Sequence, residues 1–255
     1  MDRAEHAGTV EEPVEEYGRA GAAVPCSARD GTDGEGVMDL KGVIFDLDGT
    51  LGDSMPVLCE AFRRVFETFL GRRYTDVEIT ALFGPAEEGI FRRLVPDRWR
   101  ECLQEYHRVY EEIHGRLGGP FPGIERALRL LRRRGISLAI ATGKGGHTTG
   151  ISLRDFGLAD YFDAVETGSP RGPVKPVLIR RVLERWSVPA GSVAYVGDTA
   201  YDVEAAREAG VVPLGAGWAP TAVRAVLDEA RPLASFGTVG EFVAWLERNV
   251  GPSVR

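Results

Sequence analysis

The sequence predicts an α/β fold, in which a Rossmann-like parallel sheet carries helices on both faces and an all-α cap is inserted after the first strand. From about residue 123 to 214, helical apolar spacing alternates with short, nearly continuous apolar runs, which is the pattern of a parallel sheet. Residues 53–118 show helical spacing without a strand signal, and the breaker cluster at 118–123 (GGPFPG) separates the two parts.

The first strand is predicted over residues 42–45 (GVIF), an apolar run typical of a strand buried in a parallel sheet. It ends in the sequence DLDGT, which begins at Asp46. In the insert, helices are predicted at about 55–70, 75–82, 87–94 and 97–114. After the breaker cluster, helices are predicted at 123–134, 147–155, 176–186 and 200–209, and strands at 137–141, 162–166, 193–196 and 211–214.

The negative charge is unevenly distributed along the chain. The formal net charge is −7, and residues 1–38 carry nine acids and three arginines, which give −6 of it. This segment shows no helical or strand periodicity and has few apolar residues to offset the entropy of ordering, so it is predicted to be a disordered acidic extension. The predicted core comprises residues 39–52 and 119–255, and the predicted cap comprises residues 53–118.

The composition excludes several classes of protein. A nearly neutral folded part without a basic face argues against nucleic acid as a partner. No apolar run approaches the length of a membrane span, which argues against a membrane partner. Cys26, Cys59 and Cys102 are scattered and lack metal-site spacing, which indicates a reducing compartment and predicts a cytoplasmic location.

Polar and charged residues follow several of the predicted strands. Because ligands bind at the carboxyl ends of parallel strands, we expect these residues to meet at one edge of the sheet. They are Asp46, Asp48, Thr142, Gly143, Lys175, Asp198 and Asp202.

Four carboxylates in one cleft repel each other and need a cation. Oxygen ligands with room for water suit Mg²⁺, which shares its coordination sphere with phosphate. Thr142, the amides of the glycine loop at 143–146 and Lys175 would donate hydrogen bonds to an anion. The sequence contains only three lysines against 28 arginines, so a lysine at such a position is less expected by chance.

These features, taken in order along the chain, resemble the four motifs of the haloacid dehalogenase superfamily, in its phosphatase branch. The first is FDLDGTL at 45–51, the second is Thr142 after an apolar strand, the third is Lys175 before a helix, and the fourth is GDTAYD at 197–202. The resemblance spans residues 41–215. The all-helical insert resembles the small cap of phosphoglycolate-phosphatase-like members in both position and type.

The resemblance implies a role for each motif residue. Asp46 would be the nucleophile that forms an aspartyl phosphate, and Asp48 would be the general acid and then the general base. Thr142 and the amide of Gly143 would bind phosphate oxygens. Lys175 would offset the charge of both the nucleophile and the phosphoryl group.

The same resemblance implies Mg²⁺ as the cofactor. Its ligands would be Asp46, the backbone carbonyl of Asp48 and Asp198, while Asp202 would bind through water or orient Lys175. Gly49 is assigned to the substrate-binding set, and with Thr50 it would let the chain turn sharply away from the sheet.

The cap is expected to select the substrate. Glu87 and Arg92 lie near a break at Gly84-Pro85, where related caps carry a specificity loop, so they are candidates to face the substrate. A simple helix break with solvent-exposed arginines is an equally good interpretation. Lys144 is either a second phosphate contact or, with slightly better odds, a solvent-facing lysine of the loop. His147, on the same edge, is a weaker candidate for a substrate contact.

The resemblance also narrows the range of reactions that the protein is expected to catalyse. The insert contains no lysine, which disfavours phosphonoacetaldehyde hydrolase and β-phosphoglucomutase, and Asp48 disfavours dehalogenation. The predicted activity is Mg²⁺-dependent hydrolysis of a small phosphorylated metabolite, of the phosphoglycolate or sugar-phosphate type, with nucleotides and pyrophosphate still open. A phosphotransferase or phosphomutase on the same fold, or a non-catalytic phosphate-binding protein, are the alternatives. The sequence leaves open whether the chain is a monomer or a homodimer.

Overall fold

The structure, a computed structural model, describes residues 37–253. The acidic extension predicted over residues 1–38 therefore lies almost wholly outside the described residues. Of its last two residues, Met38 donates a backbone hydrogen bond of 2.6 Å to the carbonyl of Asn249 and forms a bridge with Val250. The described chain thus joins its fold at Met38.

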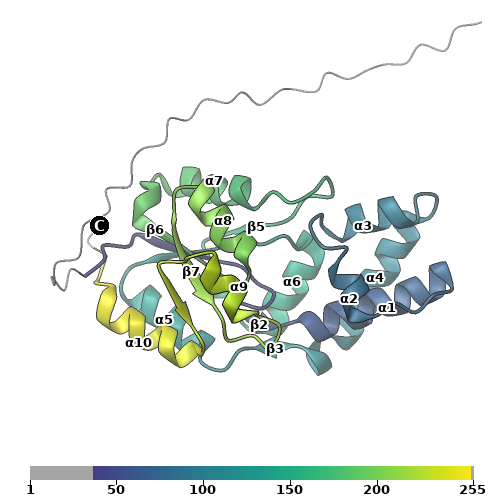
Figure 1. Ribbon diagram of the computed structural model, residues 1–255, viewed down its shortest axis with the longest axis horizontal. Helices are drawn as coiled ribbons and strands as arrows, with labels where there is room; N and C mark the ends of the chain where they lie inside the picture. The colour runs from purple at the N-terminus through teal and green to yellow at the C-terminus, as the bar shows by residue number, and fades with distance from the viewer. Residues whose placement is uncertain (1–36, 254–255) are drawn as a thin grey trace, which may run out of the picture. The chain divides into compact units, whose positions relative to one another are not determined.

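Six parallel strands form the central sheet, in the order β5-β4-β1-β6-β7-β8 (Figure 1). β1 lies inside the sheet and is buried throughout, and its Phe45 pairs with Ile140 of β4 and Val196 of β6. This register brings the carboxyl ends of these three strands together. The strands are β1 (Gly42–Phe45), β4 (Ser137–Ala141), β5 (Ala164–Glu166), β6 (Val193–Gly197), β7 (Val212–Ala216) and β8 (Ala234–Phe236).

Alternate residues of β1 reach the two faces of the sheet. Val43 and Phe45 belong to a hydrophobic cluster with α5 and α10, whereas Ile44 belongs to a second cluster with α7 and α8. Figure 1 shows these two pairs of helices on opposite sides of the strands. The predicted fold class is therefore confirmed. The helices of the core are α5 (Ile124–Arg133), α6 (Gly146–Asp155), α7 (Lys175–Trp186), α8 (Ala200–Glu208), α9 (Arg224–Glu229) and α10 (Val239–Asn249).

The insert forms a separate hydrophobic cluster, built on aromatic rings that pack at tilted angles. The ring centroids of Phe62 and Tyr106 lie 4.5 Å apart, and Phe91 packs against both. One residue from outside the insert, Ile151 of α6, completes this cluster, so α6 is the core helix on which the cap packs. The cap helices are α1 (Met55–Leu70), α2 (Asp76–Thr80), α3 (Glu87–Leu94) and α4 (Trp99–Leu117).

The two connections between core and cap pair with each other. β2 (Gly52–Asp53) and β3 (Gly119–Pro120) form a short antiparallel ladder. A Cβ at Gly52 would lie 2.3 Å from the ring of Phe156, so glycine lets the first connection pass over this ring. The cap therefore enters and leaves the core at one point.

The last strand and the last two helices are not among the sequence predictions. A signal for α10 is present, because the hydroxyl of Thr238 accepts a hydrogen bond from the amide of Glu241 and so caps the helix. Phe242 and Leu246 then follow at helical spacing and are fully buried. No helix within residues 37–253 has the length and apolar character that crossing a membrane requires.

Candidate active site

The predicted motif residues meet at the carboxyl ends of β1, β4 and β6. Asp46 directly follows β1, and its amide donates to the carbonyl of Val196, the residue of β6 beside it, at 2.9 Å. Thr142 follows β4 and Asp198 follows β6, while Lys175 is the first residue of α7 and Asp202 lies in the first turn of α8. Parallel pairing thus gathers residues that lie more than 150 positions apart in sequence.

Lys175 joins two carboxylates inside the protein. Its Nζ lies 2.7 Å from Oδ2 of Asp46 and also forms an ion pair with Oδ1 of Asp202. All three residues are at least nine-tenths buried. Burial alone would lower the pKa of Lys175, but Asp202 and Asp46 outweigh it and raise this pKa above its usual range. The lysine therefore stays charged.

Asp202 is held on both of its oxygens. Besides Lys175, its Oδ1 accepts a hydrogen bond of 3.2 Å from the hydroxyl of Tyr195, and its Oδ2 accepts one of 3.0 Å from the amide of Thr199. Thr199 and Asp202 form a reciprocal capping box at the start of α8. With both oxygens engaged, Asp202 is placed to orient Lys175, which is one of the two roles predicted for it.

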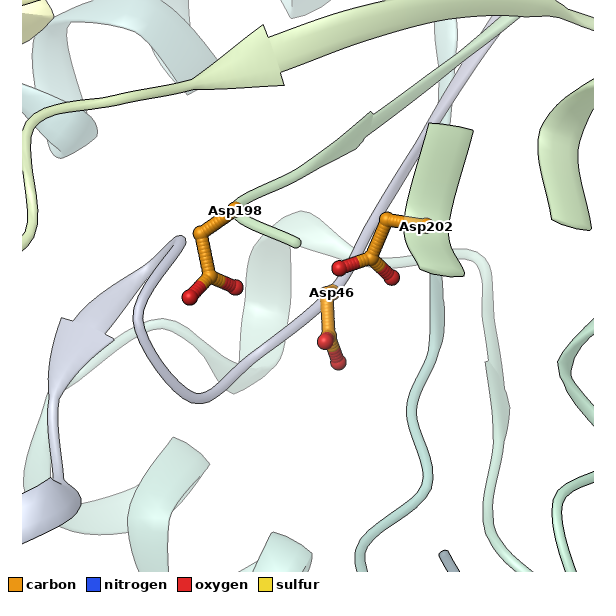
Figure 2. A group of neighbouring side chains, drawn as sticks. All are labelled: Asp46, Asp198 and Asp202. Atoms are coloured by element: carbon orange, nitrogen blue, oxygen red, sulfur yellow. The ribbon is translucent and has the colours of Figure 1, made fainter. Parts of the chain in front are cut away.

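Three acids form a group that could hold a cation. Carboxylate oxygens of Asp46, Asp198 and Asp202 lie within 4.8 Å of one another, and Figure 2 shows the three side chains lying close together beyond the ends of β1 and β6. Burial raises the pKa of Asp198, and its acidic neighbours Asp202 and Asp46 raise it further. Burial also raises the pKa of Asp46, with Lys175 opposing the shift. One ammonium does not balance three carboxylates, so the group suits an additional cation.

Gly49 turns the chain beneath this group. Its φ is +77°, and a Cβ there would lie 2.3 Å from Oδ2 of Asp198. Its amide donates to the carbonyl of Gly52 at 3.0 Å. The amide of Gly49 is thus used in the turn and its lack of a side chain permits the close approach to Asp198, while a substrate contact by Gly49 stays a prediction.

Asp48 faces a different set of partners. Its Oδ1 accepts a hydrogen bond from the hydroxyl of Ser54, at the entrance to the cap, and its Oδ2 lies 3.3 Å from Nζ of Lys144. The side chain of Lys144 is only 1% exposed and lies 4.5 Å from the ring centroid of Tyr110, in cap helix α4. The favoured solvent-facing interpretation of Lys144 is thus wrong. Its charge persists because Asp48 and Tyr110 outweigh burial and raise its pKa.

The loop after β4 keeps Thr142 buried and leaves Gly143 exposed. The hydroxyl of Thr142 accepts a hydrogen bond of 3.4 Å from the amide of Lys144, and the amide of Gly168 donates to the carbonyl of Lys144 at 2.8 Å. Close contact with Gly143 requires a glycine at 168, where a Cβ would lie 1.9 Å from the Gly143 carbonyl oxygen. This loop is therefore fixed against the segment after β5.

Glu87 does not remain free for a substrate. Its Oε2 accepts a hydrogen bond of 2.7 Å from the amide of Gly145, its Oε1 accepts one from the hydroxyl of Thr148, and the residue is 5% exposed. Gly145 caps the N-terminus of α6, where backbone amides and the helix dipole favour an anion. The cap itself supplies this anion, so Glu87 fastens α3 to the core, and its substrate contact stays a prediction.

Arg92 is engaged on the surface of the cap. Its guanidinium pairs with Glu88 one turn earlier, at 2.6 Å, and lies 4.4 Å from the ring centroid of Trp99. About half of its side chain is exposed. These contacts favour the other interpretation, an arginine on a solvated helix face, and the substrate contact by Arg92 stays a prediction. His147, the weaker candidate, is exposed and stacks on His107 of α4 at 4.1 Å.

Comparison with known proteins agrees with this geometry. The family described as haloacid dehalogenase-like hydrolase matches residues 43–216. A phosphoglycolate phosphatase from Neisseria gonorrhoeae is 31% identical over 216 residues, which cover 79% of this chain and 91% of the relative. A pyrophosphatase PpaX from Halalkalibacterium halodurans is 29% identical over 184 residues, which cover 71% of this chain and 86% of the relative.

The fold is matched over a similar extent. A haloacid dehalogenase-like hydrolase from Streptococcus pneumoniae superimposes with a TM-score of 0.68 at 28% identity, covering 82% of this chain and 99% of the other. The family match includes all four predicted motifs, from Asp46 to Asp202. The chain therefore belongs to the haloacid dehalogenase-like hydrolases, among their phosphatases.

Proposed function

We propose that this protein hydrolyses small phosphate monoesters with Mg²⁺, through an aspartyl phosphate on Asp46. The observation that carries the proposal is the Lys175 ammonium, buried between Asp46 and Asp202 with Asp198 beside them. A buried carboxylate paired with a lysine, at an edge rich in further acids, suits attack on a phosphoryl group, whose charge needs compensation.

In the first step, an oxygen of Asp46 attacks phosphorus and the bond between phosphorus and the leaving oxygen breaks. Asp48 in its acid form gives its proton to that oxygen, so the alcohol leaves neutral. Lys175 keeps its protons and offsets the charge on both Asp46 and the phosphoryl oxygens. Thr142 and the amide of Gly143 donate hydrogen bonds to those oxygens.

In the second step, water attacks the phosphorus of the aspartyl phosphate. Asp48, now a carboxylate, takes a proton from this water, and the bond between phosphorus and Asp46 breaks. Inorganic phosphate leaves, Asp46 is regenerated as a carboxylate, and Asp48 is again an acid. Asp48 thus alternates between acid and base and Asp46 between carboxylate and aspartyl phosphate, with no net change in the enzyme.

The donor set fits Mg²⁺, because every side chain offered is a carboxylate. Asp46, Asp198 and the backbone carbonyl of Asp48 would hold the ion, while Asp202, engaged on both oxygens, would contribute through water. The bound ion supplies charge stabilisation to the phosphoryl oxygens and keeps Asp46 and Asp198 ionised against the effect of burial.

The substrate class proposed is a small phosphorylated metabolite, with phosphoglycolate as the first candidate. The small all-helical cap and the similarity to phosphoglycolate phosphatase support this choice. Pyrophosphate is the second candidate, because the pyrophosphatase PpaX relative has nearly the same identity. A cytoplasmic location stays a prediction.

A panel of phosphate esters tests the proposal, with phosphoglycolate, sugar phosphates, nucleotides and pyrophosphate each assayed for released phosphate with and without Mg²⁺. We expect Mg²⁺-dependent release, and a loss on the order of 10⁴-fold or more in Asp46→Asn, which removes the nucleophile. Asp97→Asn, at an exposed acid of the cap, is the matched control and should keep full activity.

Other outcomes separate the alternatives. Transfer of the phosphoryl group to an added sugar in place of water would indicate a phosphotransferase or phosphomutase. Binding of phosphate with no turnover of any ester would indicate a non-catalytic protein and overturn the proposal.

A further inference from the structure

Lys144 is a buried charge that the reaction described above does not use. It is one of three lysines in the chain, and its side chain is only 1% exposed. Lys175, the other buried lysine of the site, pairs with the nucleophile. Lys144 instead lies 3.3 Å from Oδ2 of Asp48, the proposed acid and base.

The two oxygens of Asp48 have different partners. Ser54 donates to Oδ1 from the start of the cap connection, and Lys144 approaches Oδ2 from the loop after β4. A carboxyl group with a hydrogen bond on one oxygen and an ion pair on the other has a fixed orientation. Proton transfer depends steeply on such alignment with the leaving oxygen.

The cap forms one side of the space around Lys144. Its Nζ lies 4.5 Å from the ring centroid of Tyr110, whose hydroxyl is hydrogen-bonded to Ser152 of α6 at 2.9 Å. The next residue, Gly145, donates its amide to Glu87 of the cap. The position of Lys144 is thus set by two contacts between core and cap, as well as by its own loop.

We propose that Lys144 is a positioning residue that aims the carboxyl group of Asp48 at the leaving oxygen, and that the docked cap holds Lys144 in place through the ring of Tyr110. This inference rests on the proposed function. In the first step, the proton passes from Asp48 to the leaving oxygen, and Lys144 holds the carboxyl group in the orientation that this transfer needs. Lys144 keeps its own protons throughout.

The test compares leaving groups in a single turnover. 4-Nitrophenyl phosphate has a good leaving group that needs little protonation, whereas the best alkyl phosphate of the panel has a poor one. We expect Lys144→Met to slow first-turnover release of the alcohol by about 10²-fold, in line with loss of general-acid alignment, and release of nitrophenolate by less than about 3-fold. Lys144→Arg, which keeps the charge, should recover part of the alcohol release.

Two results would overturn the inference. An equal loss with both substrates would mean that Lys144 acts on the phosphoryl group or on the fold. A higher KM with unchanged first-turnover rates would mean that it binds phosphate, the role that its sequence position first suggested. If the wild-type protein hydrolyses no ester, the proposed function itself is wrong. This outcome is distinct, because it is measured in the wild-type protein and not in the Lys144 variants.

A second pair of variants covers the case in which Lys144→Met does not fold, as judged by urea unfolding. Tyr110→Leu removes the ring beside Lys144, and Tyr110→Phe keeps the ring and removes only the hydroxyl. A selective loss on the alkyl phosphate that is larger in Tyr110→Leu than in Tyr110→Phe supports the positioning role, because Tyr110→Phe keeps the ring and loses only the contacts of the hydroxyl. No selective loss in Tyr110→Leu, or an equal loss in the two variants, overturns it.

Discussion

The two aspartates after the first strand, only two residues apart, lie in contrasting surroundings. Asp46 pairs with Lys175 of α7, which in turn pairs with Asp202 of α8, so its partners belong to the core alone. Asp48 contacts Ser54 at the entrance to the cap and Lys144, which packs on a cap ring.

This contrast assigns the two halves of the chemistry to different parts of the molecule. Under the proposed function, the nucleophile Asp46 is held by residues of core helices. The acid and base Asp48 instead contacts Lys144, which packs on a ring of the cap. With the proposed role of Lys144, full acid and base catalysis therefore requires the docked cap.

The largest effect that would test the contrast is expected at Lys175. Lys175→Met leaves Asp46 and Asp202 buried without their cation, which should lower the free energy of unfolding by about 3–5 kcal/mol. Activity should fall by about 10³-fold, because the phosphoryl charge loses a donor. Urea unfolding measures the change in stability, and steady-state phosphate release measures the change in activity.

Adding Asp202→Asn to this variant separates the effect of Lys175 on stability from its effect on catalysis. The double variant has one fewer unpaired carboxylate, so stability should partly return while activity stays low. Recovery of activity together with stability would show that Lys175 serves the fold alone, and the assigned division between Asp46 and Asp48 would lose its basis.

The attachment of the cap should show a smaller effect. Glu87→Ala removes the acceptor of the Gly145 amide and the Thr148 hydroxyl, which should lower the free energy of unfolding by about 1–3 kcal/mol. Hydrogen exchange at the Gly145 amide should speed up, since this amide becomes exposed whenever the cap separates.

Glu88→Gln is the matched control, because Glu88 is the neighbouring acid on α3 and pairs with the exposed Arg92. Its effect on stability should stay within about 0.5 kcal/mol. Unchanged exchange at Gly145 in Glu87→Ala would argue that the cap is held by its apolar contacts with α6 alone.

The smallest effect is expected from pH, at the contact of α4 with α6. His114 is fully buried there, with Nδ1 3.1 Å from Asp155 and Nε2 3.1 Å from Ser152. Burial lowers the pKa of His114 below its usual value, and the Asp155 carboxylate only partly opposes this.

The sign of the effect follows from proton uptake. Below a pH of about 6.5, the unfolded chain protonates this histidine before the folded chain does, so stability falls as pH falls toward the lowered pKa. The slope should be up to about 1.4 kcal/mol per pH unit for one group. Urea unfolding between pH 7.5 and pH 5.5 should show a weaker pH dependence in His114→Gln than in the wild type, and equal slopes would contradict the assignment.

Elements with a strong local signal were predictable from the sequence. The strand at 137–141 and the helix at 87–94 have in the structure the bounds that were predicted. Strand Ala234–Phe236 was not predicted, because its three residues ASF carry little hydrophobic pattern and only pairing with β7 makes them a strand. Helix α10 had a usable signal in its Thr238 cap.

The site was predictable where it depends on strand ends. Asp46, Thr142, Asp198 and Lys175 meet because parallel strands end at one edge, which hydrophobic pattern and motif order already imply. The contacts that Glu87 and Lys144 make were not predictable, since both depend on how the cap docks. Contacts across that interface join residues far apart in sequence, such as Gly145 with Glu87 and Lys144 with Tyr110, and no local pattern encodes them.

The sequence by itself thus determined the α/β fold, the inserted helical cap and the order of the residues that carry the chemistry. These depend on periodicity and on short motifs, which act over a few residues. Only the tertiary structure decided that Glu87 fastens the cap, that Arg92 stays on its surface and that Lys144 lies buried beside Asp48. The positions of Glu87 and Lys144 depend on packing between the cap and the loop after β4, where burial makes an unpaired charge costly and so selects its partner. The position of Arg92 depends on contacts within the cap, with Glu88 and Trp99.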